Sequence, residues 1–305
     1  MSHPPSSPSS GARLLLPEVL ARIDNLQLLA KTVVEGFLNG LHRSIYLGLS
    51  LDFAEHRPYM PGDDIRRIDW RLYGRTDRHY IKLFEAETNA NFVVLMDVSR
   101  SMAYGTHVLT KLDYARYLAA CLTYFARTQR DRVGLMTFDE DVVEFIPPSA
   151  RNLDLCLHAL HRADAREPGE LKRPLGKALE TLRRRGILVL ISDLYQPAED
   201  VVQAVRLLQS PGHDVLVFHL LDPAELEFPF EGTASFRDME TREELPLVPG
   251  KVREGYKGHL RDHVGELRDR FAGGQVDYAV LDTSKPLERA LFHLLLHREK
   301  GRRTR

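Results

Sequence analysis

The amino-acid sequence predicts an α/β fold with a doubly wound, mostly parallel sheet. The strongest indication is the stretch 92–96, five apolar residues in a row that end at Asp97. An uninterrupted apolar run of this length is typical of a strand buried on both faces in the middle of a parallel sheet. From residue 91 onward, strand-like and helix-like segments alternate along the chain. This alternation favours parallel strands that are joined by right-handed helical crossovers.

The individual elements follow from apolar periodicity and from the turn residues between segments. A helix over 111–128 carries its apolar residues on one face, and a strand over 132–138 follows it. The segment 142–146 is expected to run antiparallel to that strand, because only a short turn separates the two. Residues 228–248 interrupt the alternation and are expected to form a small β-excursion. The other expected strands are 187–191, 214–220 and 276–281, and the other expected helices are 153–161, 175–184, 198–208, 253–271 and 286–297.

The chain divides into four segments by composition and pattern. They are a disordered tail (1–12), an N-terminal helical and small β module (13–90), the α/β domain (91–297) and a basic tail (298–305). Within the N-terminal module, apolar residues at helical spacing predict one helix from about residue 14 to residue 41. Alternating apolar residues predict short strands over 47–53 and 79–84.

Composition restricts the possible partners and the compartment. The chain has 42 Lys and Arg against 43 Asp and Glu, a formal net charge of −1, so no overall field selects nucleic acid. No apolar run approaches the ~20 residues that a membrane-spanning helix needs. The N-terminus lacks the charged start and apolar core of a signal peptide. Cys121 and Cys156 lie among apolar residues and are expected to be buried, reduced thiols, which favours the cytoplasm.

Polar residues follow the apolar run 92–96 at alternate positions. Asp97, Ser99 and Ser101 offer only oxygen donors, which suits a hard cation such as Mg²⁺. Asp193 follows a second apolar run, 187–191. Because ligands bind at the carboxyl ends of the strands in open α/β sheets, these residues are candidates for one shared site. The alternative is local, with Asp97 or Ser99 capping a helix or forming a turn with its own backbone.

Asp97, Ser99, Ser101 and Asp193 resemble the metal-ion-dependent adhesion site of von Willebrand factor A-like domains. That resemblance covers residues 91 to 296 and implies a bound Mg²⁺ whose open position takes an acidic side chain of a partner protein. Upstream of this domain the chain contains the ordered motif Gly48-Leu49-Ser50, Phe53, Arg57, Tyr59, Pro61-Gly62-Asp63-Asp64 and Ile68-Asp69-Trp70. This motif is similar to that of a bacterial family known as domain of unknown function fifty-eight. The second resemblance implies a MoxR-type AAA+ ATPase as partner. It implies no particular activity, because none is established for that family.

One position departs from the adhesion-site pattern. The pattern requires a threonine before the helix that contains Leu175, where this chain places Arg173. Arginine cannot ligate a cation, so we expect its guanidinium to lie over Asp97 and Asp193 in place of a metal. The upstream motif holds several charges and the only tryptophan, and its role is unknown. A mutually paired network with an anchoring aromatic is the default expectation for Arg57, Asp63, Asp64, Arg66, Asp69 and Trp70.

These observations favour a non-enzymatic protein-interaction module that docks an acidic residue of a partner. Phosphate-cradling, nucleophile-elbow and zinc-helix motifs are all missing from the sequence. Two alternatives remain open at this stage. One is a metal-dependent hydrolase that uses the carboxylate-rich sheet edge or the Asp63, Asp64 and Asp69 cluster. The other is a structural scaffold in which the loop carboxylates only cap helices.

Overall fold

The computed structural model describes residues 17–23, 25–43, 56–58, 80–82, 90–210 and 212–303. The expected tail 1–12 and the expected strand 47–53 lie outside these ranges. The same holds for Asp63, Asp64, Arg66, Asp69 and Trp70 of the upstream motif. Arg57 lies in the short strand β1 (His56–Pro58), which pairs antiparallel with β2 (Tyr80–Lys82). β2 falls within the strand predicted over 79–84.

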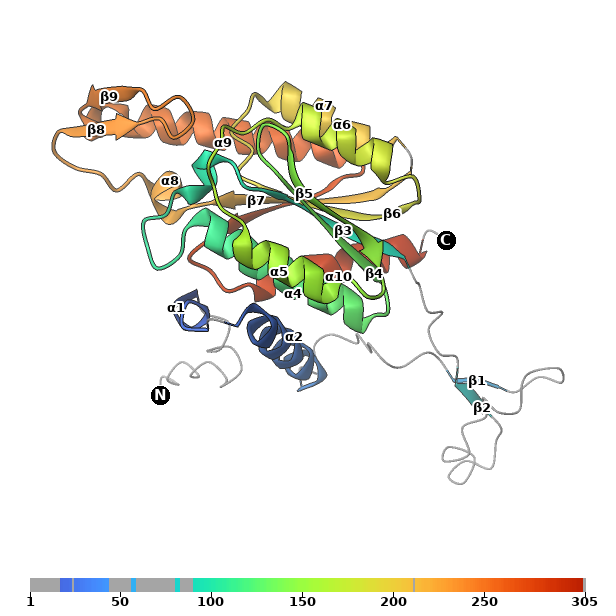
Figure 1. Ribbon diagram of the computed structural model, residues 1–305. Helices are drawn as coiled ribbons and strands as arrows, with labels where there is room; N and C mark the ends of the chain where they lie inside the picture. The colour runs from blue at the N-terminus through green and yellow to red at the C-terminus, as the bar shows by residue number, and fades with distance from the viewer. Residues whose placement is uncertain are drawn as a thin grey trace, which may run out of the picture.

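The fold is organised around a six-stranded sheet (Figure 1). The order across it is β10-β7-β6-β3-β4-β5, and every neighbouring pair is parallel except β4 and β5. The predicted doubly wound, mostly parallel sheet is therefore confirmed, including its antiparallel edge strand. The strands are β3 (Asn91–Asp97), β4 (Arg132–Phe138), β5 (Val142–Ser149), β6 (Gly186–Ser192), β7 (Asp214–Leu221) and β10 (Asp277–Asp282).

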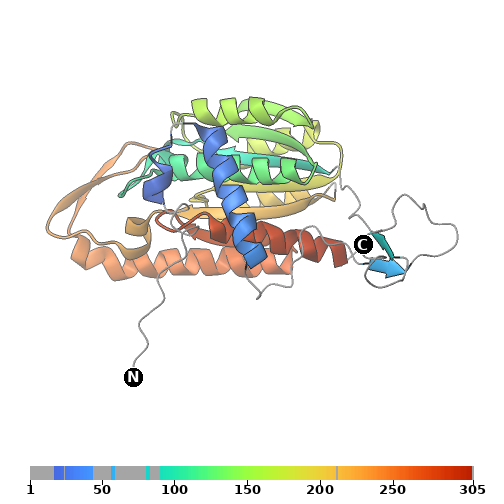
Figure 2. The same cartoon turned by 90° about the horizontal axis from the view of Figure 1, so that it is seen from below.

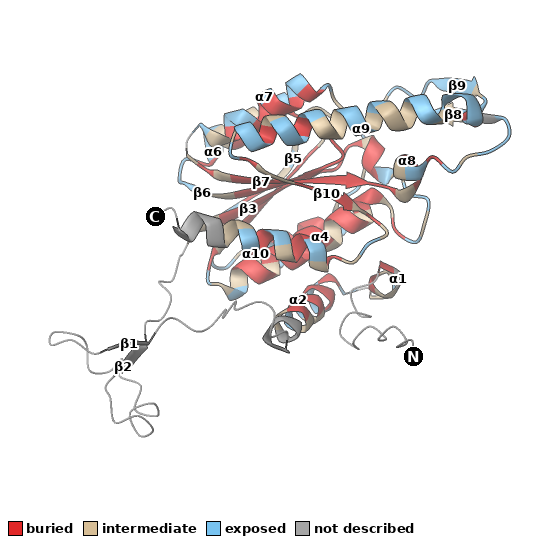
Figure 3. Ribbon diagram, turned by 180° about the vertical axis from the view of Figure 1, so that it is seen from behind, coloured by how far each residue is buried: buried red, intermediate tan, exposed pale blue. Residues whose placement is uncertain are grey.

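Helices cover both faces of this sheet because its strands are apolar on both sides (Figures 1 and 3). In β3, Phe92, Val94 and Met96 join one buried cluster, and Val93 and Leu95 join the other. The first face carries α4 (Lys111–Thr128), α5 (Leu153–Arg162) and α10 (Glu288–Arg303), and the second carries α6 (Lys172–Thr181), α7 (Ala198–Gln209) and α9 (Pro249–Gly273).

The N-terminal helical segment packs on the outer side of the first helical layer (Figure 2). It consists of α1 (Pro17–Leu20) and α2 (Leu26–Arg43) rather than the single helix predicted from 14 to 41. The helix restarts at Asn25, whose side-chain Oδ1 accepts a hydrogen bond from the backbone N–H of Leu28 at 2.9 Å. Asparagine is a favoured N-cap residue, and this cap explains the break that apolar periodicity alone concealed.

The expected β-excursion over 228–248 is present as an antiparallel hairpin of β8 (Ala234–Arg237) and β9 (Glu244–Leu247). It lies between the short helix α8 (Pro223–Glu227) and α9. The expected basic tail from 298 is instead the last part of α10, which continues to Arg303. Arg298 contacts Asp131 there, and its guanidinium carbon lies 5.4 Å from the centre of the Phe92 ring.

Cys121 and Cys156 are free thiols in the interior, as the sequence predicted, and burial raises the pKa of both. Among the helices within the described ranges, none combines the length and the apolar character that crossing a bilayer requires.

Candidate functional site

Asp97 lies at the carboxyl end of β3 and is only 4% exposed. Its Oδ1 accepts the backbone N–H of Ser99 at 2.8 Å, and its Oδ2 accepts the hydroxyl of Ser192 at 2.6 Å. Ser192 is in reach because β3 and β6 are paired in register up to Met96 and Ile191. Burial, together with the nearby charge of Asp193, raises the pKa of Asp97 to about 7. The bond to Ser99 is also the local turn that the sequence left open as an alternative.

The two serines of the motif lie beside Asp97, around the short 3₁₀ helix η4 (Arg100–Ala103). Their hydroxyl oxygens are 3.2 Å apart, and both residues are buried. Asp97, Ser99, Ser101 and Asp193 all line one cavity of about 110 Å³. The structure therefore brings the four residues of the predicted adhesion site together at a single edge of the sheet.

A lysine that the sequence did not indicate supplies a cation at this edge. The Nζ of Lys111 donates hydrogen bonds to Oδ2 of Asp193 at 2.7 Å and to Oε1 of Glu225 at 2.8 Å. The Lys111 side chain is 0% exposed. Burial alone would lower the pKa of Lys111, but the two carboxylates outweigh it and hold the pKa above its ordinary value. Lys111 is consequently a charged ammonium inside the protein, and its Nζ also lies 4.6 Å from the centre of the Tyr195 ring.

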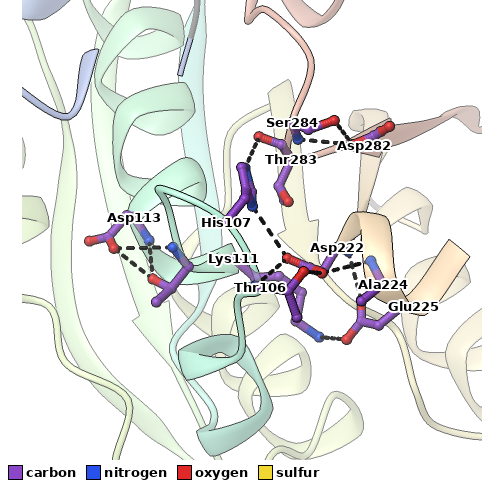
Figure 4. Close-up of polar contacts among 11 residues, drawn as sticks. Thr106, His107, Lys111, Asp113, Asp222, Ala224, Glu225, Asp282, Thr283 and Ser284 are labelled. Atoms are coloured by element: carbon purple, nitrogen blue, oxygen red, sulfur yellow. Dashed lines mark hydrogen bonds and ion pairs between the residues drawn. The ribbon is translucent and has the colours of Figure 1, made fainter. Parts of the chain in front are cut away.

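The elements that hold Lys111 and Glu225 are fixed by two capping boxes (Figure 4). Thr110 and Asp113 cap the start of α4, which places Lys111 in its first turn. Asp222 and Glu225 cap α8, where Oε2 of Glu225 accepts the backbone N–H of Asp222 at 2.7 Å. Asp222 also accepts the backbone N–H of Thr106 at 3.0 Å, so it ties the loop before α4 to the end of β7.

Arg173 does not occupy the position that the sequence analysis assigned to it. Its Nη2 donates to Oδ2 of Asp141 at 2.7 Å, and its side chain is 60% exposed. α6 begins at Lys172, so Arg173 lies in the first turn of that helix and faces the β4–β5 turn that contains Asp141. The prediction that Arg173 covers Asp97 and Asp193 is therefore wrong. The cation that contacts Asp193 is Lys111, from the opposite helical layer.

Glu240, in the turn of the β8–β9 hairpin, places its carboxylate at the same cavity. Its Oε1 accepts the backbone N–H of Ser101 at 2.9 Å, and its Oε2 accepts the backbone N–H of Gly169 at 2.9 Å. The main-chain oxygen of Glu240 accepts Nη1 of Arg100 at 2.7 Å. Nothing in the sequence singles out this glutamate, whereas the Asp222–Glu225 spacing is a capping signature that could have been found.

The residues at the cavity fit a hydrated Mg²⁺ in part. The hydroxyls of Ser99 and Ser101 and the carboxyl of Asp97 are oxygen donors on one cavity, which is the donor type that Mg²⁺ takes. Asp193 has one oxygen committed to Lys111. Within the part of the chain that the structure describes, no group of three or more His, Cys, Asp and Glu residues is arranged to hold a metal. A cation here would be held by hydroxyls, one carboxylate and water.

The strand order, the antiparallel edge strand and the Asp-x-Ser-x-Ser segment after β3 define a von Willebrand factor A-like domain. The chain belongs to the family described as "Protein of unknown function DUF58", whose model matches residues 55–266. Uncharacterized protein Rv1480 of Mycobacterium tuberculosis (strain H37Rv) is 29% identical over 232 residues, which cover 74% of this chain and 72% of the relative. Uncharacterized protein Mb1516 of Mycobacterium bovis matches equally well.

Solved structures with this type of fold are more distant. The conserved hypothetical protein BatB from Bacteroides thetaiotaomicron is 18% identical, with a TM-score of 0.48, and the match covers 69% of this chain and 99% of that chain. The SpRpn10 VWA domain is 13% identical, with a TM-score of 0.41, over 66% of this chain and 92% of that chain. At these similarities, the assignment of the fold depends on the strand order of this chain itself.

Proposed function

We propose that the protein is a non-enzymatic interaction module that binds an acidic side chain of a partner at the carboxyl edge of its sheet. The observation that carries this proposal is the contact with Glu240. Two backbone N–H groups, of Ser101 and Gly169, converge on the two oxygens of one carboxylate. A carboxylate that accepts two backbone N–H groups makes charge-assisted hydrogen bonds, which are stronger than neutral ones. This edge of the sheet is thus built to accept a carboxylate.

Mg²⁺ is part of the proposal as a second source of attraction for the incoming carboxylate. The groups that would hold it are the hydroxyls of Ser99 and Ser101 and the carboxyl of Asp97. Burial raises the pKa of Asp97 to about 7, so a cation beside this carboxyl would favour its ionised form. When bound, the ion would supply positive charge and an open coordination position. The protein itself supplies the two N–H donors and the buried Lys111–Asp193 pair that keeps the edge in place.

A MoxR-type AAA+ ATPase is the partner that we propose, with this chain acting as its adaptor. The support for this partner is the family resemblance of the upstream motif, and the support for the mode of binding is the carboxylate-accepting edge. von Willebrand factor A-like domains are typically interaction modules, which agrees with a role in recruitment. Among the described residues, the carboxylates of Asp193 and Glu225 are committed to Lys111, which disfavours their use in the hydrolase alternative, and the Asp63, Asp64 and Asp69 cluster lies outside the described residues.

The test uses the purified MoxR-type ATPase of the same organism and calorimetric titration with this protein. We expect binding by the wild type, and at least tenfold weaker binding by Asp97→Ala. The matched control is Asp154→Ala, which removes an exposed carboxylate at the start of α5. β5 runs antiparallel and ends beside Val133 at the start of β4, so α5 begins at the opposite edge of the sheet. Asp97 holds the segment that contains Ser101 by accepting the backbone N–H of Ser99, so equal affinity of the wild type and Asp97→Ala would refute docking at this edge whether or not a metal takes part.

The role of the metal is separated by repeating the titration in excess EDTA and in Mg²⁺. If the ion takes part, EDTA weakens binding by the wild type and by Asp154→Ala, and Ser99→Ala loses the dependence on Mg²⁺. If the backbone N–H groups are sufficient, EDTA leaves the affinity unchanged and the Mg²⁺ part of the proposal falls.

A further inference from the structure

The β8–β9 hairpin is an arm that leaves the sheet after α8 and returns to it through α9 (Figure 3). Its base is anchored by Arg253 of α9, which donates to the main-chain oxygens of Phe228 at 3.1 Å and Phe230 at 2.8 Å. The rings of Phe228 and Tyr256 pack with their centres 4.7 Å apart. The base therefore has an apolar attachment of its own that does not depend on the turn.

The turn of the arm is preorganised to present Glu240. Oδ1 of Asp238 accepts the backbone N–H groups of Glu240 at 2.7 Å and of Thr241 at 2.9 Å. The backbone N–H of Asp238 donates to the main-chain oxygen of Glu243 at 2.8 Å, which closes the turn. A rigid turn loses little conformational entropy when the Glu240 carboxylate binds, so few hydrogen bonds are enough to hold the turn against the cavity.

The contact between the turn and the cavity is small and polar. It consists of the Glu240 carboxylate on Ser101 and Gly169, and of Arg100 on the main-chain oxygen of Glu240. The strands behind the turn are largely exposed, including Leu245 of β9. Such a contact can open while the aromatic base of the arm stays in place, because the two attachments share no residue.

We propose that Glu240 is an intramolecular ligand of this site, so that the carboxylate of a partner binds by displacing the hairpin turn. The proposal rests on the proposed function, since it takes the same two N–H groups as the docking point. It identifies the form of the ligand as an acidic residue in a tight turn that approaches as a hairpin. It also implies that the free protein holds its own site closed.

The test is binding in trans of the hairpin's own sequence. A fluorescein-labelled peptide of residues 234–247 is titrated into the wild type, Glu240→Ala and Glu231→Ala, with fluorescence anisotropy as the readout. Glu231→Ala is the matched control, because it removes an exposed carboxylate from the same arm. A tethered ligand has an effective concentration of about millimolar, so its removal opens the site to ligands in solution. We expect Glu240→Ala to bind at least tenfold tighter than the other two proteins.

A second peptide that carries alanine in place of Glu240 shows whether binding depends on the glutamate carboxylate. We expect it to bind Glu240→Ala at least tenfold more weakly than the native peptide. Equal binding of the native peptide to all three proteins, or no binding to any, would overturn the proposal. Hydrogen exchange gives an independent readout, because the amides of Ser101 and Gly169 should exchange about tenfold faster in Glu240→Ala. Unchanged exchange at both amides would also overturn it.

The outcomes separate this proposal from the proposed function. If Asp97→Ala weakens the ATPase complex while Glu240→Ala changes neither peptide nor ATPase binding, the docking site is supported and the role of Glu240 as an intramolecular ligand is refuted. If the peptide binds Glu240→Ala selectively while Asp97→Ala leaves the ATPase complex intact, the role of Glu240 as an intramolecular ligand is supported and the assignment of the ATPase as the partner at this site is refuted.

Discussion

Replacement of Lys111 by methionine should destabilise the protein far more than the loss of a surface charge. The Lys111 ammonium is inaccessible to solvent, and its partners Asp193 and Glu225 are both buried. Methionine has a similar length but no charge, so the variant leaves two carboxylates without their cation. Removal of one partner from a buried ion pair costs about 3–5 kcal/mol. We therefore expect the free energy of unfolding at pH 7.5 to fall by about that amount.

The assay is urea unfolding followed by circular dichroism, with the transition midpoints compared at an unchanged slope. The control is Lys177→Met, which removes a half-exposed lysine that pairs with Asp141 at the surface. Solvent screens an exposed pair of that kind, so Lys177→Met should change the transition midpoint far less than Lys111→Met. Addition of Glu225→Gln to Lys111→Met should restore part of the loss, because one orphaned carboxylate is then neutral. A loss below about 1 kcal/mol for Lys111→Met would refute the buried ion-pair account.

Two further predictions concern His219, a buried histidine of β7, and Gly169, which lies beside Ser99 at the rim of the site. Burial lowers the pKa of His219 from 6.5 to about 3, so between these values the unfolded state binds more protons than the folded state. The contribution of His219 to stability should then be fully present above pH 6.5 and fall by about 1.4 kcal/mol per unit below it, whereas the raised pKa of Asp97 gives a contribution of opposite sign over part of the same range. His219→Phe should lack this part of the slope, as measured by urea unfolding at pH 5, 6 and 7, and an identical slope would contradict the assignment. A Cβ added at Gly169 would lie 2.8 Å from Cβ of Ser99. Gly169→Ala should cost about 1–3 kcal/mol and speed hydrogen exchange in the β8–β9 turn. Gly176→Ala is the control, because a Cβ added at Gly176 has no neighbouring atom within 4 Å and should neither lower the stability nor speed this exchange. Equal exchange rates in the two variants would contradict the prediction.

The part of the site that lies on the sheet could be predicted because it depends on short-range signals. Two uninterrupted apolar runs identify β3 and β6 as central strands, and the polar residues that end them must lie at the carboxyl edge. The capped helix α4 was likewise predicted with its observed bounds, 111–128. Local sequence therefore determined where Asp97, Ser99, Ser101 and Asp193 meet.

The rest of the site depends on tertiary contacts that no local pattern encodes. Lys111 in the first turn of a helix looks like a solvated lysine until Asp193 and Glu225 are placed around it. Arg173 was assigned to Asp193 because it stood at the expected position in the motif. Asp141, which the structure places beside α6, is its actual partner. Glu240 is one of several charged residues in the excursion, and only the path of the hairpin brings it to the cavity.

The central claim, that two backbone N–H groups at this edge bind a carboxylate, can be measured at those groups. In the ¹⁵N-labelled protein, the amide resonances of Ser101 and Gly169 should have the downfield proton shifts of N–H groups bonded to a charged oxygen. Glu240→Ala should move both upfield, and addition of the 234–247 peptide should return both toward their wild-type positions. If the two resonances stay where they are in Glu240→Ala, with and without peptide, no carboxylate is bound there and the account is contradicted.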